Sequence, residues 1–277
     1  MPRLHLAARA DQGAGLSARL ESPGGRGPDA VSVGPLRADR PGPTRRGAHL
    51  VLTTLRLAHR GDWRSAPENS LEAIRAALAI PACDGLEFDV QPSADGVPVL
   101  LHDETLLRVQ GVDARCADLP VRELVRLGIP TFEAVLELVA ASARRPEPFL
   151  DIEFKAPVPA AVPLIDAARG ESDGTLRRAV VSTFHPATMA WLAAERPSWA
   201  RWGNVEDLGP KVLEVAARLG CEAVSADWRT IDAASMASAR DHGLDVAAWT
   251  VRDRRTFRRL ERLGVIAICA EAAALDG

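Results

Sequence analysis

Residues 85–90 read Gly-Leu-Glu-Phe-Asp-Val, an apolar run interrupted by two acids at alternate positions. Side chains alternate between the two faces of a β-strand, so the apolar residues share one face while Glu87 and Asp89 share the other. The run therefore predicts a strand that directs two carboxylates to the same place.

Similar short runs lie on both sides of this strand, and segments with helical periodicity separate them as far as the C-terminus. Such alternation indicates βαβ units and a parallel sheet. No G-x-G-x-x-G pattern follows the first strand, which disfavours an open, doubly wound sheet. We therefore predict an α/β fold, a TIM-type (β/α)8 barrel. Its expected strands are Leu55–Ala58, Gly85–Val90, Phe149–Phe154, Ala179–Thr183, Arg201–Asn204, Ala223–Ser225, Val246–Trp249 and Val265–Cys269. Its expected helices are Ser70–Ala79, Thr131–Ala141, Pro159–Ala168, Pro186–Ala194, Gly209–Leu219, Ile231–His242 and Asp253–Leu263.

One segment interrupts this rhythm. Val97–Leu101 is a further strand pattern, and only a short turn containing Asp95-Gly96 separates it from Val90. An Asp-Gly pair between two strand patterns is typical of a hairpin. We expect a small β-hairpin excursion after the second strand, which returns the chain to the barrel mouth at His102.

The composition divides the chain into two parts. Residues 1–50 are rich in Gly, Pro and Arg and lack periodicity, so we predict a poorly ordered extension, followed by a barrel domain over residues 51–277. No signal-peptide core and no run of about 18 apolar residues is present, which argues against stable membrane insertion. Four widely spaced cysteines suit a reducing compartment, and we expect a soluble cytoplasmic protein.

The overall charge gives no sign of a nucleic-acid partner. The formal net charge is -3 and the pI is near 6.1, so no global field would attract a polyanion. The sequence does not indicate the oligomeric state. Any binding of phosphate must depend on local positive charge.

Polar residues follow the first strands of the predicted barrel. In a parallel barrel the active site lies at the carboxyl ends of the strands. Glu87 and Asp89 lie near the end of one strand, and Glu153 near the end of the next. Like charges brought together in this way favour a cation, and oxygen ligands select a hard divalent ion. We predict that these three residues bind Mg²⁺ or Ca²⁺; the alternative is a carboxylate set satisfied by arginines and backbone amides.

Two of the six histidines, His59 and His102, directly follow apolar strands and would lie at the barrel mouth. Histidine titrates near neutral pH, so a pair that flanks a scissile bond can act as general base and general acid. Arg60 and Lys155 would place positive charge beside the metal, which suits a phosphate group. Their alternative role is to balance the charge of the acids.

Several motifs in this order resemble the glycerophosphodiester phosphodiesterase family, from Leu55 to the C-terminus. They are Leu57-Ala58-His59-Arg60-Gly61, Pro67-Glu68-Asn69-Ser70, Glu87-Phe88-Asp89-Val90, Leu101-His102-Asp103 and Ile152-Glu153-Phe154-Lys155. Later segments around Thr131, Thr183 and Trp249 also resemble the family.

The resemblance implies a TIM barrel that hydrolyses glycerophosphodiesters to sn-glycerol 3-phosphate and an alcohol. It implies that His59 and His102 are catalytic, that Glu87, Asp89 and Glu153 bind metal, that Arg60 and Lys155 contact phosphate and that Trp249 lines the substrate pocket. The chain departs from the family where the last strand is followed by Ala270-Glu271, without the usual Thr-Asp-x-Pro segment.

Two alternative functions remain open at the level of sequence. A lysophospholipase D-like or sphingomyelinase D-like enzyme would use the same residues on a lipid diester, although no amphipathic anchor is evident in the sequence. A catalytically silent phosphate-ligand binder would keep the fold, but it would be expected to lack one of the histidines or carboxylates, and all five are present.

Overall fold

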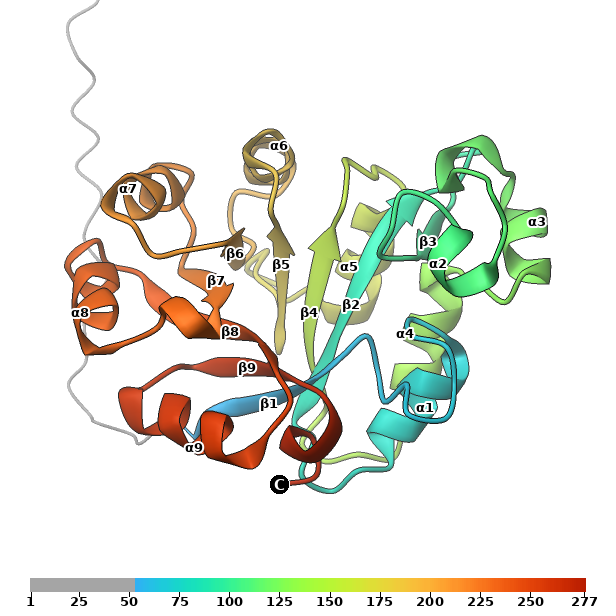
Figure 1. Cartoon of the computed structure of the whole chain (residues 1–277). Helices are drawn as coiled ribbons and strands as arrows, with labels where there is room; N and C mark the ends of the chain where they lie inside the picture. Colours follow the sequence, from blue (N-terminus) through green and yellow to red (C-terminus); the bar gives the residue numbers. More distant parts are fainter. Residues whose placement is uncertain (1–52) are drawn as a thin grey trace, which may run out of the picture. The chain divides into compact units, whose positions relative to one another are not determined.

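The computed structural model describes residues 53–277, and within them eight parallel strands close into a barrel (Figure 1). The predicted extension, residues 1–50, lies outside the described residues. The ring closes because β1 pairs with both β2 and β9. Its strands are β1 Leu55–His59, β2 Gly85–Pro92, β4 Phe149–Phe154, β5 Ala179–Thr183, β6 Arg201–Val205, β7 Ala223–Asp227, β8 Asp245–Val251 and β9 Ala267–Ala270.

Helices between the strands cover the outside of the barrel (Figure 1). The main hydrophobic core lies between these helices and the outward faces of the strands, and includes Phe88, Phe132 and Phe154. The TIM-barrel prediction is thus confirmed. The helices are α1 Leu71–Leu78, α4 Phe132–Ala141, α5 Ala161–Arg169, α6 Pro186–Glu195, α7 Pro210–Arg218, α8 Ala233–Asp241 and α9 Arg254–Leu263.

The side chains inside the barrel form an apolar layer and, further along the barrel axis, a polar layer. A small apolar cluster contains Leu57, Trp202 and Ala223. Two residues further along the same strands, His59, Asn204 and Ser225 line a cavity. Because residues two apart share a strand face, the apolar layer forms the floor on which the polar residues stand.

The predicted hairpin is also present. Strand β3, Pro98–Leu100, pairs antiparallel with β2 outside the ring. The chain then forms the short helices α2 Leu107–Gln110 and α3 Val121–Arg126, with a 3-10 turn at Cys116–Asp118 between them. Val99, Leu106 and Leu124 belong to a separate small core within this insertion. Among the described residues, no helix is both long and apolar enough to cross a membrane.

Candidate active site

The end of β1 places two predicted residues at the barrel mouth. His59 is the last residue of the strand, and the backbone N–H of Arg60 donates to the carbonyl of Glu87 on β2 at 2.9 Å. Arg60 has a φ of 60° and Gly61 a φ of +83°. A Cβ on Gly61 would lie 2.6 Å from the carbonyl carbon of Ala73 in α1. Position 61 therefore requires glycine. Because Gly61 has no Cβ, the backbone of α1 can pack directly against the turn that follows β1.

Three buried carboxylates form the predicted metal site. Glu87, Asp89 and Glu153 can each offer one oxygen such that all three atoms lie within 4.8 Å of one another. The strand register explains this arrangement, because Asp89 of β2 is directly opposite Glu153 of β4. A donor set made only of carboxylate oxygens fits a hard divalent cation such as Mg²⁺ or Ca²⁺.

The acids of this cluster differ in protonation. Burial, reinforced by the charges of neighbouring acids, raises the pKa of Glu87 well above its usual value and that of Glu153 to about 7. Burial also opposes the charge of Asp89, but Lys155 and Arg60 outweigh it and hold the pKa of Asp89 below its usual value. Fully ionised, the three carboxylates would carry one negative charge more than Arg60 and Lys155 balance, and without a further cation this excess raises the pKa of Glu87 and Glu153. A divalent ion would allow all three to ionise.

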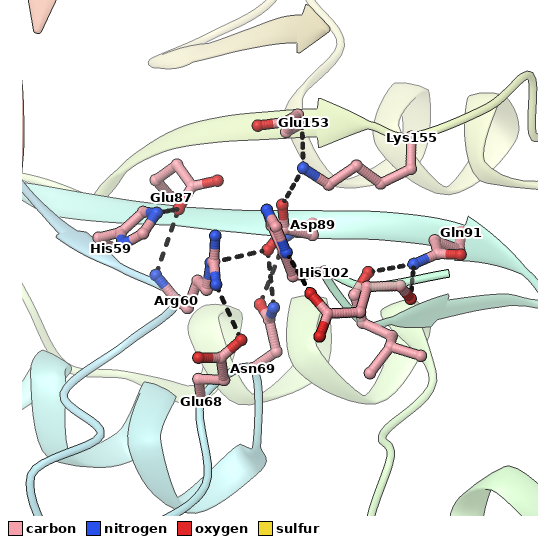
Figure 2. Close-up of polar contacts among 12 residues, drawn as sticks. His59, Arg60, Glu68, Asn69, Glu87, Asp89, Gln91, His102, Glu153 and Lys155 are labelled. Atoms are coloured by element: carbon pink, nitrogen blue, oxygen red, sulfur yellow. Dashed lines mark hydrogen bonds and ion pairs between the residues drawn. The ribbon is translucent and has the colours of Figure 1, made fainter. Parts of the chain in front are cut away.

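Arg60 and Lys155 approach Asp89 from two sides (Figure 2). Arg60 Nε lies 3.2 Å from Asp89 Oδ2, and Lys155 Nζ lies 2.8 Å from Asp89 Oδ1. Lys155 also donates a short hydrogen bond to Glu153. Both cations line the cavity beside the carboxylates, where a phosphate group could reach them.

Each histidine has a carboxylate on its Nδ1 atom. His59 Nδ1 lies 2.5 Å from Glu271 Oε1, and His102 Nδ1 lies 2.7 Å from Asp103 Oδ1. A carboxylate in this position favours the tautomer with its proton on Nδ1, which leaves Nε2 free to accept a proton. Burial lowers the pKa of both histidines. Both rings are thus prepared for proton transfer through Nε2.

Glu271 is a site residue that was not predicted from the sequence. It follows β9 directly, and it also accepts a hydrogen bond from Arg252 Nε at 2.7 Å. Burial disfavours the charged form of Glu271, but the bonds to His59 and Arg252 hold its pKa below the usual value. A signal was available, because Glu271 is a polar residue at a strand end like the residues that were predicted.

Further side chains hold the His102 segment in place. Gln91 of β2 donates from Nε2 to the carbonyls of Leu101 and Asp103, each at 2.7 Å (Figure 2). These two bonds attach the backbone before and after His102 to β2. Arg108 of α2 bonds to Asp103 at 2.6 Å and to Glu68 at 2.6 Å. The insertion therefore connects one histidine to the loop that follows β1.

The motif at residues 67–70 does more than begin a helix. Ser70 is the N-cap of α1, and its side chain accepts a hydrogen bond from the Ala73 N–H. Asn69 is buried and donates from Nδ2 to Asp89 Oδ2 at 2.8 Å (Figure 2). Glu68 accepts from Arg60 Nη1 at 2.8 Å. Asn69 thus supports the predicted metal site, and Glu68 holds the arginine.

The eight predicted site residues gather around one cavity of about 340 Å³. Seven of them line it, and Asp89 lies fully buried against Arg60 and Lys155. Trp249 lines the side formed by β8, where its Nε1 donates to the carbonyl of Ser225 at 2.9 Å and its ring meets Phe184 edge to face. Asn204 supports the metal site from β6, since its Nδ2 donates to Glu153 at 3.0 Å.

Comparison with known proteins agrees with this geometry. The family model described as the Glycerophosphoryl diester phosphodiesterase family matches residues 59–274, which include every residue of the candidate site. The chain belongs to this family. The family prediction made from the motifs is confirmed.

Individual members of the family match over shorter segments. A glycerophosphodiester phosphodiesterase of Caldanaerobacter subterraneus is 36% identical over 101 residues, which cover 32% of this chain and 41% of the relative. Glycerophosphodiester phosphodiesterase 1 of Bos taurus is 40% identical over 90 residues, covering 31% of this chain and 27% of the relative. The matches thus span less than half of either relative.

A solved structure shows the same fold over most of both chains. The phosphodiesterase of Oleispira antarctica, in complex with the product sn-glycerol-3-phosphate, superposes with a TM-score of 0.68. It is 24% identical and covers 79% of this chain and 93% of its own. At this identity the likeness supports the barrel fold.

Proposed function

We propose that the protein hydrolyses glycerophosphodiesters to sn-glycerol 3-phosphate and an alcohol. The observation that carries the proposal is that His59, His102, Arg60 and Lys155 line one cavity together with two of the three clustered carboxylates. Membership of the family supports the same reaction. The product named in the Oleispira antarctica complex supports glycerol 3-phosphate as the phosphate-bearing product.

The carboxylates of Glu87, Asp89 and Glu153 would hold the divalent ion, Mg²⁺ or Ca²⁺. When bound, such an ion supplies positive charge that stabilises the oxygens of a transferring phosphoryl group. Arg60 and Lys155 add two fixed positive charges from the protein itself. Both remain protonated at neutral pH because the pKa of each is raised, burial being outweighed by the nearby acids.

The two histidines would transfer the protons. One Nε2 takes the proton of the attacking hydroxyl, and the other gives a proton to the departing alkoxide. The attacking group is either water or a neighbouring hydroxyl of the glycerol, and the second route passes through a cyclic phosphate. Trapping of a cyclic product in single-turnover experiments distinguishes the routes.

Release of glycerol 3-phosphate from glycerophosphocholine by EDTA-stripped protein, with Mg²⁺ or Ca²⁺ restored, tests the proposal. We expect metal-dependent release, and a loss of roughly 10²-fold or more in kcat for His59→Ala and for His102→Ala. His242→Ala is the matched control, since this histidine is the C-cap of α8, bonds to the Ser238 carbonyl of that helix and does not line the cavity. Folded protein that releases no product with either ion, or full activity in either histidine variant, would refute the assignment.

A further inference from the structure

The helix α9 concentrates positive charge that the active site does not use. Residues 252–263 contain six arginines and two acids, a net charge of +4, whereas the whole chain has a net charge of -3. The helix lies on the outside of the barrel, beside the C-terminal segment (Figure 1). A protein with no global positive field can attract an anionic partner only through such a local concentration.

The arginines of α9 form a row along one face of the helix. Residues four apart lie on the same face of an α-helix. Arg254, Arg258 and Arg262 follow this spacing, and Arg255 and Arg259 follow it one position further on. The opposite face carries Phe257 and Leu260, which are buried in the main core. We refer to the five arginines as the α9 stripe.

The α9 stripe is accessible, and its charge is not balanced within the described residues. Arg259 is half-buried and donates to the carbonyl of Trp228. The four others are exposed, and among residues 53–277 none of them takes part in an ion pair; they are Arg254, Arg255, Arg258 and Arg262. Their guanidinium groups are therefore available to a partner.

This arrangement opposes the stability of the isolated helix. Like charges four residues apart repel each other, and the stripe contains three such pairs. Arg254 and Arg255 also lie in the first turn, where the positive end of the helix dipole disfavours cations. Asp253, the N-cap, is the one acid beside that turn. A pattern that breaks local rules without a compensating contact points to a functional role.

The stripe extends to the barrel mouth. Because α9 follows β8, whose carboxyl end lies at the mouth, Arg254 is at the mouth end of the helix and Arg262 at the other end. A hollow of about 320 Å³ at this end is lined by residues that include Trp63 and Arg252. Trp63 is 38% exposed. An indole combines an apolar ring with a polar N–H, and such rings favour the interface between membrane and water.

These features fit a lipid surface better than a nucleic acid. Proteins that bind single-stranded nucleic acid place aromatic rings among their cations, so that bases can stack on them. The exposed face of α9 has no aromatic side chain, since Phe257 is buried, and Trp63 lies beyond one end of the stripe. A bilayer presents many anionic headgroups in one plane, with which a row of arginines can interact without specific geometry.

We infer that the α9 stripe docks the protein reversibly on an anionic membrane surface, with Trp63 in the headgroup region. The apolar face of α9 packs against the barrel, so the helix contributes charge and does not insert into the bilayer. Docking in this way holds the edge of the barrel mouth against the lipid headgroups. The inference does not depend on which phosphodiester the protein hydrolyses.

Sedimentation of the full chain with vesicles tests the inference. We expect binding to vesicles of phosphatidylcholine mixed with phosphatidylglycerol and none to phosphatidylcholine alone. Binding should disappear at about 1 M NaCl, where the Debye length is about 3 Å. The triple variant Arg255→Gln/Arg258→Gln/Arg262→Gln should lower the partition coefficient by roughly 10²-fold, about fivefold for each arginine. Trp63→Ala should weaken binding without changing its dependence on salt.

The matched control removes three exposed arginines from other helices, as Arg75→Gln/Arg122→Gln/Arg218→Gln on α1, α3 and α7. It changes the net charge by the same amount, but exposed charges far from the contact are screened, so its partition coefficient should stay within about threefold of the wild type. Circular dichroism establishes that both triple variants are folded.

The inference is overturned if the wild type binds neither kind of vesicle, or if the stripe and control variants lose binding equally. Binding of a single-stranded RNA that depends on the stripe, in place of binding to anionic vesicles, would assign the stripe to nucleic acid and would also overturn it. The vesicle measurement needs no turnover. Failure of the proposed reaction and failure of this inference are therefore distinguished.

Discussion

At the scale of single residues, the backbone adopts costly conformations at several positions in and beside the site. Arg60, Asn69 and Ala272 have positive φ values without being glycine. Each such residue costs on the order of 1–3 kcal/mol. Arg60 and Asn69 contact the carboxylates of the metal site, and Ala272 follows Glu271, the partner of His59. Three of the four non-glycine residues with positive φ among residues 53–277 thus flank the groups that must be placed accurately; the fourth, Arg178, precedes β5 and does not line the cavity.

The position of His59 and His102 at the barrel mouth could be predicted from sequence because each follows an apolar strand directly. Glu271 satisfies the same rule, yet its partner His59 is 212 residues away in the chain. Asn69 lies in a motif that local capping explains without any site. The contact between His59 and Glu271 could not be predicted from local sequence, because it forms only when β9 pairs with β1 and closes the ring.

Glu271→Gln tests the role of this carboxylate as a positioning residue. The amide keeps the size of the side chain but removes the charge that stabilises the protonated His59 ring. We expect kcat to fall by roughly 10²-fold with KM changed by less than about threefold. Steady-state kinetics on glycerophosphocholine separates the two constants.

Arg252→Ala is the control, because it removes the other partner of Glu271 while leaving the bond to His59. It should have a small effect on kcat. An unchanged kcat in Glu271→Gln, or a change in KM alone, would show that Glu271 does not position the histidine.

At the scale of elements, the strands were predicted more accurately than the segments between them. Seven of the eight barrel strands begin within one residue of their predicted start, and β9 begins two residues late. The strands have strong apolar runs with polar ends. The short helices α2 and α3 were not predicted, since helices of 4 and 6 residues are too short to establish a period.

The turn after β1 determines how closely α1 approaches the site. Gly61→Ala would add a Cβ at a φ of +83°, at 2.6 Å from the Ala73 carbonyl carbon. We expect the free energy of unfolding to fall by about 3 kcal/mol or more, measured by urea denaturation.

Gly128→Ala provides a matched control for this substitution. Gly128 has the same φ of +83°, but nothing lies within 4 Å of its Cβ position. It should cost only about 1 kcal/mol, which is the cost of the backbone conformation. Equal losses in the two variants would show that contact with α1 contributes nothing.

At the scale of the whole molecule, the barrel interior holds more acid than its own cations balance. Asp151 lies on β4 next to the three clustered carboxylates without belonging to the cluster, and its carboxylate accepts a hydrogen bond from Ser182 at 2.6 Å. Burial raises the pKa of Asp151 to about 7. The folded barrel therefore binds a proton at Asp151 that the unfolded chain releases at lower pH.

This difference predicts how stability depends on pH. A carboxyl whose pKa is raised on folding favours the folded state below its unfolded pKa, and this contribution is lost as pH rises towards the folded pKa of about 7. Asp151→Asn has no such proton, while its amide can still bond to Ser182. Relative to wild type, the variant should therefore gain stability as pH rises, by on the order of 2 kcal/mol between about pH 5 and about pH 8.

Urea denaturation of wild type and variant in EDTA at both pH values measures this gain, because metal would otherwise compensate the charge. Asp166→Asn is the control for loss of one carboxylate, since Asp166 pairs with Arg196 at the surface. It should show no comparable dependence on pH. If the free energies of unfolding of the wild type and Asp151→Asn change in parallel with pH, the pKa of Asp151 is not raised by folding. The barrel would then accommodate the charge of Asp151 without cost, and an excess of buried negative charge would no longer be an argument that this interior binds a metal ion.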